Sequence, residues 1–162
     1  MTYGAVASTT ESRKLDKAVK EAAALVAKEY SNNTNLSFTK AYKGTKTRIG
    51  FTPDGGLFFL DGELILAVEA KKQNNEGNAI ERWYKNHFIV RELNPTASYL
   101  TFGCGSGATE TAVIGRTLSW AHPDGFNSYN HRKNSCYLST DGYTVEEVAA
   151  VIRTALDTFI NE

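Results

Sequence analysis

The sequence predicts a single α/β domain over residues 1–162, with a central mixed β-sheet flanked by helices. Strong helical patterns lie near both ends of the chain, and strand and helix patterns alternate between them. A hairpin signal, Asp61-Gly62, separates two apolar runs in the first half. With 162 residues and 41% hydrophobic content, the chain is long enough to bury one core.

The first helix is expected from Ser8 to Tyr30. Ser8 and Glu11 have the spacing of a capping box, in which two side chains satisfy free backbone N–H groups at the start of a helix. Apolar residues then recur at helical spacing at Leu15, Ala18, Val19, Ala22, Leu25 and Val26. The polar segment 31–50 predicts a loop with one short strand.

The hairpin is predicted from two strands, 57–60 and 63–71, around the Asp61-Gly62 turn. The second strand contains LILAVEA, which is apolar on both faces and so predicts a central strand covered on both sides. We expect a helix from Asn78 to Glu92, a buried strand in SYLTFGC and a short strand in SCYLST.

A second capping box, Thr144 with Glu147, predicts the start of the final helix. One face of this helix is apolar, through Val145, Val148, Ala149, Ile152, Leu156 and Phe159.

Composition excludes several classes of protein. No apolar stretch approaches the length that crosses a bilayer, and the N-terminal residues lack the pattern of a secretory signal. Two cysteines, Cys104 and Cys136, are too few for a disulfide framework and have no metal-type spacing. We therefore expect a cytoplasmic protein with reduced thiols and no membrane partner.

The formal net charge is zero, yet the charges are unevenly distributed. The segment between Ser31 and Pro53 has basic residues and no acidic one: Lys40, Lys43, Lys46 and Arg48. Such a basic stretch suits phosphate groups, which makes Lys43 and Lys46 candidates for DNA contacts. An ordinary solvated loop is the alternative.

The hairpin is the candidate catalytic element. Side chains alternate along a strand, so Glu69 and Lys71 are expected on one face, together with Glu63, Ile65 and Ala67. Asp54 leads into the neighbouring antiparallel strand and is expected near Glu69. The sequence thus predicts two carboxylates and an amine in one small space.

Two carboxylates held together repel unless a proton or a cation lies between them, and Mg²⁺ prefers such oxygen ligands. A metal and a lysine together suit a phosphodiester substrate, with Lys71 orienting or activating water. The order P-D…E-x-K is the pattern of a large nuclease superfamily. The alternatives are a turn role for Asp54 and, for Glu69 and Lys71, ordinary cross-strand ion pairing on a sheet edge.

The segment GNAIERWYKN (77–86), which we call the recognition segment, follows this pattern. It resembles the G-N-A-x-E-R block of EcoRI-type restriction endonucleases, the PD-(D/E)xK enzymes that read sites with an AATT core. The matching residues are Gly77, Asn78, Ala79, Glu81 and Arg82, extended by Lys85 and Asn86. PDGG, EAK and Gln73 agree in order, so the resemblance covers about residues 52–86.

The resemblance implies a restriction-endonuclease-like core around the catalytic hairpin and a type II restriction endonuclease. It implies Mg²⁺ bound by Asp54, Glu69 and the Ala70 carbonyl, with Lys71 assisting the attacking water. The recognition segment would contact double-stranded DNA, and a palindromic site implies a homodimer. A companion DNA methyltransferase is a further partner that this interpretation allows.

The residue types of the recognition segment suit base readout: Asn pairs with adenine, Arg with purine acceptors and Glu with an exocyclic amine. The alternative for Asn78 and Glu81 is a capping box, and Ile80, Tyr84 and Phe88 are expected to face the core. The chain departs from the family in one respect. Only residues 72–77 separate Lys71 from Asn78, so any DNA-embracing arm there is short or missing.

Two other functions fit part of the pattern. A structure-specific or repair nuclease would need the hairpin residues but not the recognition segment. A non-catalytic DNA-binding module would use the acids in structural ion pairs only.

Overall fold

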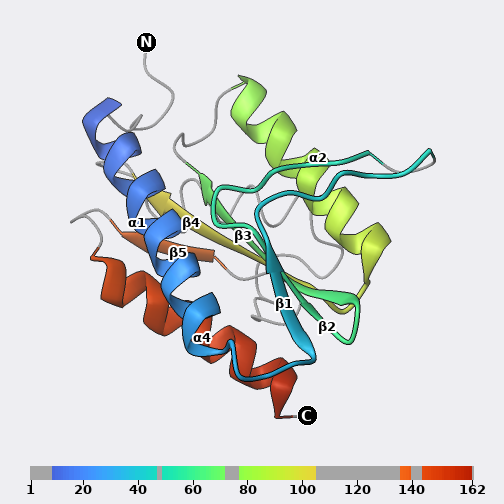
Figure 1. Cartoon of the computed structure of the whole chain (residues 1–162). Helices are drawn as coiled ribbons and strands as arrows, with labels where there is room; N and C mark the ends of the chain where they lie inside the picture. Colours follow the sequence, from blue (N-terminus) through green and yellow to red (C-terminus); the bar gives the residue numbers. More distant parts are fainter. Residues whose placement is uncertain (1–8, 47–48, 72–76, 105–135, 140–143, 162) are drawn as a thin grey trace.

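The computed structural model describes residues 9–46, 49–71, 77–104, 136–139 and 144–161 (Figure 1). Its elements are α1 (Thr9–Glu29), β1 (Leu36–Thr39), β2 (Leu57–Leu60), β3 (Glu63–Lys71), α2 (Gly77–Leu93), β4 (Ser98–Cys104), β5 (Cys136–Ser139) and α4 (Val145–Ile160). The predicted hairpin strands and the strand over 98–104 are confirmed, and the helices lie close to their expected positions. Ser8, the expected first cap, lies outside the described residues. No helix in the described ranges is long and apolar enough to cross a membrane.

The described strands form one mixed sheet in the order β1-β2-β3-β4-β5. β1, β2 and β3 pair antiparallel, whereas β4 is parallel to both β3 and β5. Parallel neighbours need a crossover connection, and α2 provides it between β3 and β4. β3 has neighbours on both sides, which confirms the prediction of a central strand. The chain therefore has an α/β fold with a mixed sheet.

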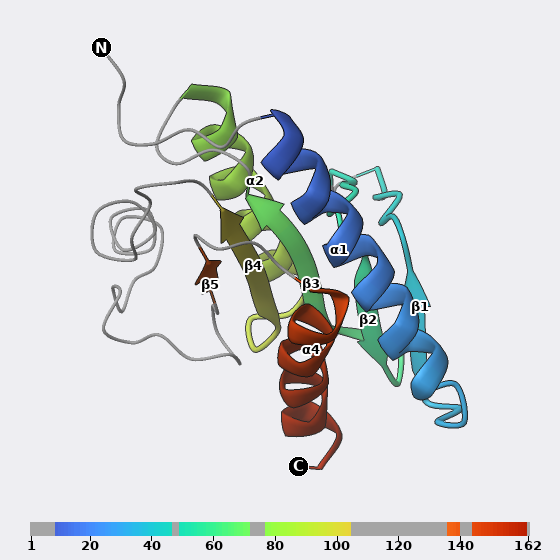
Figure 2. The same ribbon diagram turned by 90° about the vertical axis from the view of Figure 1, so that its left-hand side faces the viewer.

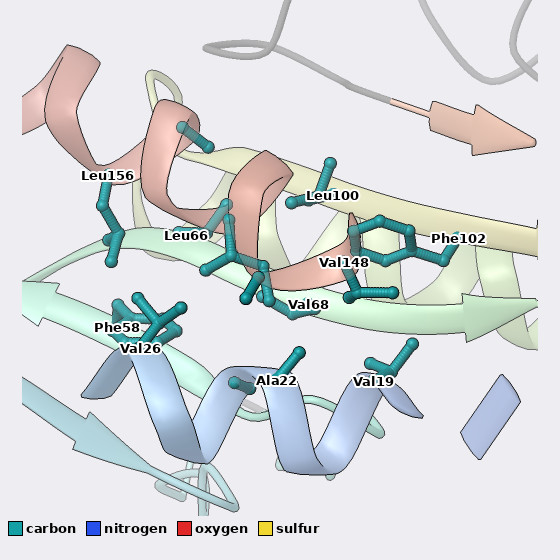
Figure 3. Close-up of a cluster of buried hydrophobic side chains, with 14 of the residues drawn as sticks. Val19, Ala22, Val26, Phe58, Leu66, Val68, Leu100, Phe102, Val148 and Leu156 are labelled. Carbon is teal, nitrogen blue, oxygen red and sulfur yellow. The ribbon is translucent and has the colours of Figure 1, made fainter. Parts of the chain in front are cut away.

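α1 and α4 pack together on one face of this sheet, as two views of the chain show (Figures 1 and 2). The apolar stripes predicted for both helices meet the strands in a buried cluster (Figure 3). Its fully buried members include Val19, Val26, Phe58, Leu66 and Leu156. A second cluster, on the other face, joins the hairpin and β4 to α2. β3 contributes residues to both clusters, so it organises the whole core.

A bulge in β3 corrects one prediction about its faces. In the register with β2, Leu64 and Leu66 have partners but Ile65 does not. The extra residue shifts the alternation of side chains, so Ile65 and Leu66 both join the cluster under α1 and α4. Ala67 packs in the cluster beside α2. The prediction that Ile65 shares a face with Ala67 and Glu69 was therefore wrong.

The buried side of α2 also differs from the prediction. Ile89 and Val90 are buried, whereas Phe88, expected in the core, is 76% exposed. Three consecutive apolar residues offer more than one helical stripe, and tertiary packing chose between them. The side chains of Ile80 and Tyr84 lie outside the described part of the chain.

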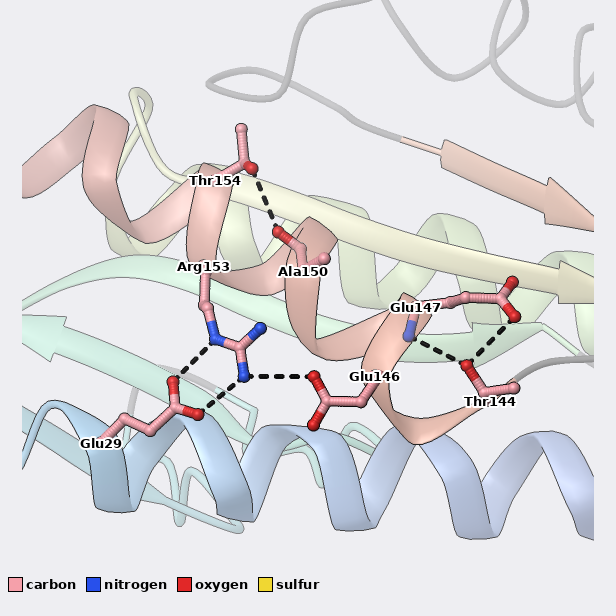
Figure 4. A network of polar contacts seen from close by, with 7 residues as sticks. All are labelled: Glu29, Thr144, Glu146, Glu147, Ala150, Arg153 and Thr154. Carbon is pink, nitrogen blue, oxygen red and sulfur yellow. Dashed lines mark hydrogen bonds and ion pairs between the residues drawn. The ribbon is translucent and has the colours of Figure 1, made fainter.

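Polar contacts fix the start of α4 and its edge against α1 (Figure 4). The Thr144 hydroxyl accepts a hydrogen bond from the Glu147 N–H at 3.1 Å and donates to the Glu147 carboxylate at 3.0 Å, which confirms the predicted cap. Arg153 donates to both carboxylate oxygens of Glu29, each at 2.7 Å, and lies 3.6 Å from Glu146. The bidentate ion pair between Arg153 and Glu29 joins α4 to α1 at the surface.

Two phenylalanines test which residues form the core. Phe58→Ala removes a fully buried ring and should lower the free energy of unfolding by about 3–5 kcal/mol. Phe88→Ala removes a ring that is 76% exposed and should change it by less than about 0.5 kcal/mol. Urea unfolding of both variants measures the difference. Equal losses would contradict the packing described here.

Candidate functional site

Asp54 lies in the turn that leads into β2, and this turn lies directly against β3. The Gly56 N–H donates to the Pro53 carbonyl at 3.0 Å, and the Gly55 N–H donates to the Val68 carbonyl at 2.8 Å. A Cβ atom at Gly55 would lie 2.6 Å from Val68 Cγ1, so only glycine allows this approach. The turn therefore holds Asp54 beside the carboxyl end of β3.

Asp54 and Glu69 meet at this point. The Asp54 N–H donates to Glu69 Oε1 at 3.0 Å, and the Ala70 N–H donates to Asp54 Oδ2 at 3.2 Å. Each carboxylate thus accepts a backbone hydrogen bond from the strand or turn that carries the other. The structure brings the two acids together, as antiparallel pairing of the hairpin predicted. We call Asp54 and Glu69 the acid pair.

Two further side chains hold Glu69. Its Oε2 atom accepts hydrogen bonds from Asn86 Nδ2 of α2 at 3.1 Å and from the Tyr99 hydroxyl of β4 at 3.2 Å. Tyr99 is fully buried, in the cluster that also contains Ala67 and Val90. Glu69 is therefore fixed from the turn before β2, from α2 and from β4.

The sequence alone does not assign Asn86 and Tyr99 to this site. It predicts Asn86 only as part of the recognition segment and Tyr99 only as part of a buried strand. For Tyr99 the sequence contains a signal, because a tyrosine in a buried strand needs a hydrogen-bond partner for its hydroxyl. Asn86 lies one helical turn before the buried Val90, on the sheet side of α2.

The electrostatics of the acid pair favour a bound proton or cation. Burial raises the pKa of Glu69 well above 4.5, and the nearby carboxyl group of Asp54 and its charge raise this pKa further. The Asp54 N–H and the Tyr99 hydroxyl offset part of this rise. Burial, followed by the charge of Glu69, also raises the pKa of Tyr99 well above 10.0. Ionisation of Glu69 beside Asp54 is thus unfavourable in the free protein.

The oxygen atoms at this point match the ligands that Mg²⁺ prefers. The Ala70 N–H points toward Asp54. Because the N–H and C=O of one strand residue point to the same side of the strand, the Ala70 carbonyl faces that side as well. Within the described residues, no three His, Cys, Asp or Glu side chains gather as a metal cluster. The acid pair and one carbonyl are therefore the candidate ligand set.

Lys71 is the last residue of β3 and pairs with Gly103 of β4. The structure describes its backbone only, so the predicted approach of its ammonium group to the acid pair lies outside the described part.

The recognition segment forms the first turns of α2. The backbone is helical from Gly77 onwards, and Lys85 is exposed. The remaining predicted DNA-contacting side chains, Asn78, Ala79, Glu81 and Arg82, lie outside the described side chains. Lys43 and Lys46 are exposed in the connection between β1 and β2, which extends away from the sheet (Figure 1).

Comparison of the chain with protein-family models, curated proteins and solved structures found no match. The resemblance of residues 52–86 to restriction endonucleases therefore stays a prediction from the sequence. A functional assignment rests on the residues and on the geometry of the acid pair.

The raised pKa of Glu69 predicts how stability depends on pH. Between 4.5 and the pKa of Glu69 in the folded protein, the folded chain binds more protons than the unfolded chain, so the free energy of unfolding falls as the pH rises. Glu69→Gln should abolish this fall. Urea unfolding across that pH range, without divalent cations, measures it.

Glu63→Gln is the matched control, because Glu63 is an exposed acid of the same strand. It should keep the wild-type pH dependence. Parallel pH profiles for the wild type and Glu69→Gln would show that Glu69 titrates as an ordinary surface acid.

Proposed function

We propose that this chain is a type II restriction endonuclease. It would hydrolyse both strands of duplex DNA at a short palindrome containing AATT, with Mg²⁺, on a restriction-endonuclease-like core. The observation that supports this most strongly is the contact between Asp54 and Glu69 at the end of the central strand, in the order P-D…E-x-K. The recognition segment follows at the start of the next helix.

Mg²⁺ would be held by the carboxylates of Asp54 and Glu69 and by the Ala70 carbonyl. The fit rests on the donor set, since all three groups offer oxygen and Glu69 resists ionisation beside Asp54 without a cation. When bound, the ion supplies positive charge that stabilises the negative charge of the phosphodiester in the transition state.

The chain's own residues position this chemistry. Backbone N–H groups of Asp54 and Ala70 orient the two carboxylates before substrate arrives, which removes that ordering from the reaction. In the proposal, Lys71 orients the attacking water and helps it to lose a proton. The water oxygen then bonds to phosphorus, the opposite P–O bond breaks, and the leaving oxygen takes up a proton.

The start of α2 would read the bases. Asn78 and Arg82 would donate to purines, Glu81 would accept from an exocyclic amine, and the small Ala79 would allow close approach. The helix N-terminus, where Gly77 lies, favours a nearby phosphate. Lys43, Lys46 and Lys85 would contact phosphates, as their exposure permits. A palindrome requires two such helices, so the active species would be a homodimer.

Plasmid digestion with Mg²⁺ separates this function from its alternatives. Discrete fragments, with ends at AATT-containing palindromes, are expected. A smear would favour a structure-specific or repair nuclease that uses the acid pair alone. DNA affinity that does not depend on Mg²⁺, without cleavage, would favour a non-catalytic DNA-binding module.

Removal of the proposed catalytic groups should separate cleavage from binding. Asp54→Ala and Lys71→Ala should each slow cleavage by about a thousandfold or more, because stabilisation of the transition-state charge is worth several kcal/mol. Both variants should still bind an AATT-containing duplex in a gel-shift assay. Glu63→Gln is the control and should cleave normally. Full turnover by either variant would refute the mechanism.

Arg82→Lys tests the recognition segment, because it keeps the charge but replaces a fork of donors by a single ammonium group. It should lose specific cleavage, with discrimination against the wrong base reduced by about 5- to 150-fold. Lys43→Ala is the contrast. It should weaken binding to all sequences alike. It should also lower the slope of log affinity against log salt concentration by about one.

Competition binding with matched and mismatched duplexes distinguishes the two effects. Undiminished AATT specificity in Arg82→Lys would count against the assignment of the recognition segment.

A further inference from the structure

We infer that Asn86 and Tyr99 are positioning residues that fix the carboxylate of Glu69 for a divalent cation. The inference rests on the proposed function and deepens it. It also gives α2 a second role, because the helix that begins with the recognition segment then holds one of the two acids through Asn86.

The hydrogen bonds of Glu69 fix its carboxylate group at both oxygens. Oε2 accepts from Asn86 at 3.1 Å and from Tyr99 at 3.2 Å, while Oε1 accepts from the Asp54 N–H at 3.0 Å. The three donors come from different elements of the fold. A carboxylate held at both oxygens cannot rotate freely, so its plane and its distance from Asp54 are set by the surrounding structure.

The two side-chain donors are themselves held in place. Tyr99 is 0% exposed, and its ring packs in the same cluster as Val90 of α2. Asn86 precedes Val90 by four residues, so both lie on one face of the helix. Because Val90 holds that face against the sheet, packing sets the position of the Asn86 backbone from which the amide reaches Glu69.

Holding the Glu69 carboxylate in one orientation before a cation binds strengthens that binding. A glutamate side chain has several rotatable bonds, and ordering them when the ion arrives opposes binding. Donors that hold the carboxylate beforehand remove this cost, and outer partners of this kind typically change metal affinity by about 10- to 100-fold. Asn86 and Tyr99 occupy that position relative to Glu69.

The geometry also argues against a direct DNA role for Asn86. Its amide nitrogen is already directed at Glu69, in a part-buried hydrogen bond from the middle of α2. Lys85, the preceding residue, is exposed instead. Loss of the Asn86 amide should therefore alter cation binding and leave the cation-free affinity for DNA unchanged.

The test measures Mg²⁺ binding by calorimetry in the Lys71→Ala background, with an AATT-containing duplex that this background leaves intact. Adding Asn86→Leu, which removes the amide at similar volume, or Tyr99→Phe, which removes only the hydroxyl, should each weaken Mg²⁺ binding about tenfold. Phe88→Ala, on the exposed face of the same helix, should leave it unchanged. With Lys71 present, cleavage by both variants should need about tenfold more Mg²⁺ and should recover its maximal rate at saturation.

Mg²⁺ affinity equal to that of the Lys71→Ala parent in both variants overturns the inference and leaves the proposed function intact. A parent that binds no Mg²⁺ overturns both. Weaker DNA affinity of Asn86→Leu without any cation would assign Asn86 to DNA contact instead. If Asn86→Leu fails to fold, Tyr99→Phe keeps the ring and decides alone.

Discussion

Contact between two carboxylates, Asp54 and Glu69, at the end of a buried strand ties together the turn before β2, α2 and β4. Their proximity opposes the ionisation of Glu69, because burial and the neighbouring carboxyl group of Asp54 both raise the pKa of Glu69. The chain nevertheless holds them with backbone hydrogen bonds, and it uses a glycine turn that no other residue would fit. Unfavourable pairs of this kind gather at functional sites, where a ligand relieves them.

The bulge at Ile65 explains how Glu69 comes to face α2. Leu64 and Ala67 lie in the same cluster although an odd number of positions separates them, which is possible only because the bulge shifts the alternation. Without it, Glu69 would share the face of α1 and α4, away from Asn86 and Tyr99. One extra residue therefore places the acid pair beside the helix that begins with the recognition segment. The crossover from β3 through α2 to β4 then supplies the remaining contacts of Glu69.

The local patterns of the sequence predicted most of the elements, because each pattern depends on neighbours in the chain. The Asp61-Gly62 turn, the apolar run of β3 and the Thr144 cap all act within a few residues. Three features could not be predicted, because they depend on packing between distant segments. These are the bulge at Ile65, the exposure of Phe88 beside two other apolar residues, and the hydrogen bonds of Tyr99 and Asn86 to Glu69. The acid pair itself was predictable, since antiparallel pairing of one short hairpin suffices to bring its members together.

Crystallography with Mn²⁺ can show whether the acid pair binds a divalent cation. Manganese prefers the same oxygen ligands as magnesium and has an anomalous signal that locates it without reference to activity. We expect one anomalous peak per chain, with Asp54, Glu69 and the Ala70 carbonyl as protein ligands. Crystals soaked in Mn²⁺ that show no peak there, with the Asp54 and Glu69 hydrogen bonds unchanged, would contradict it.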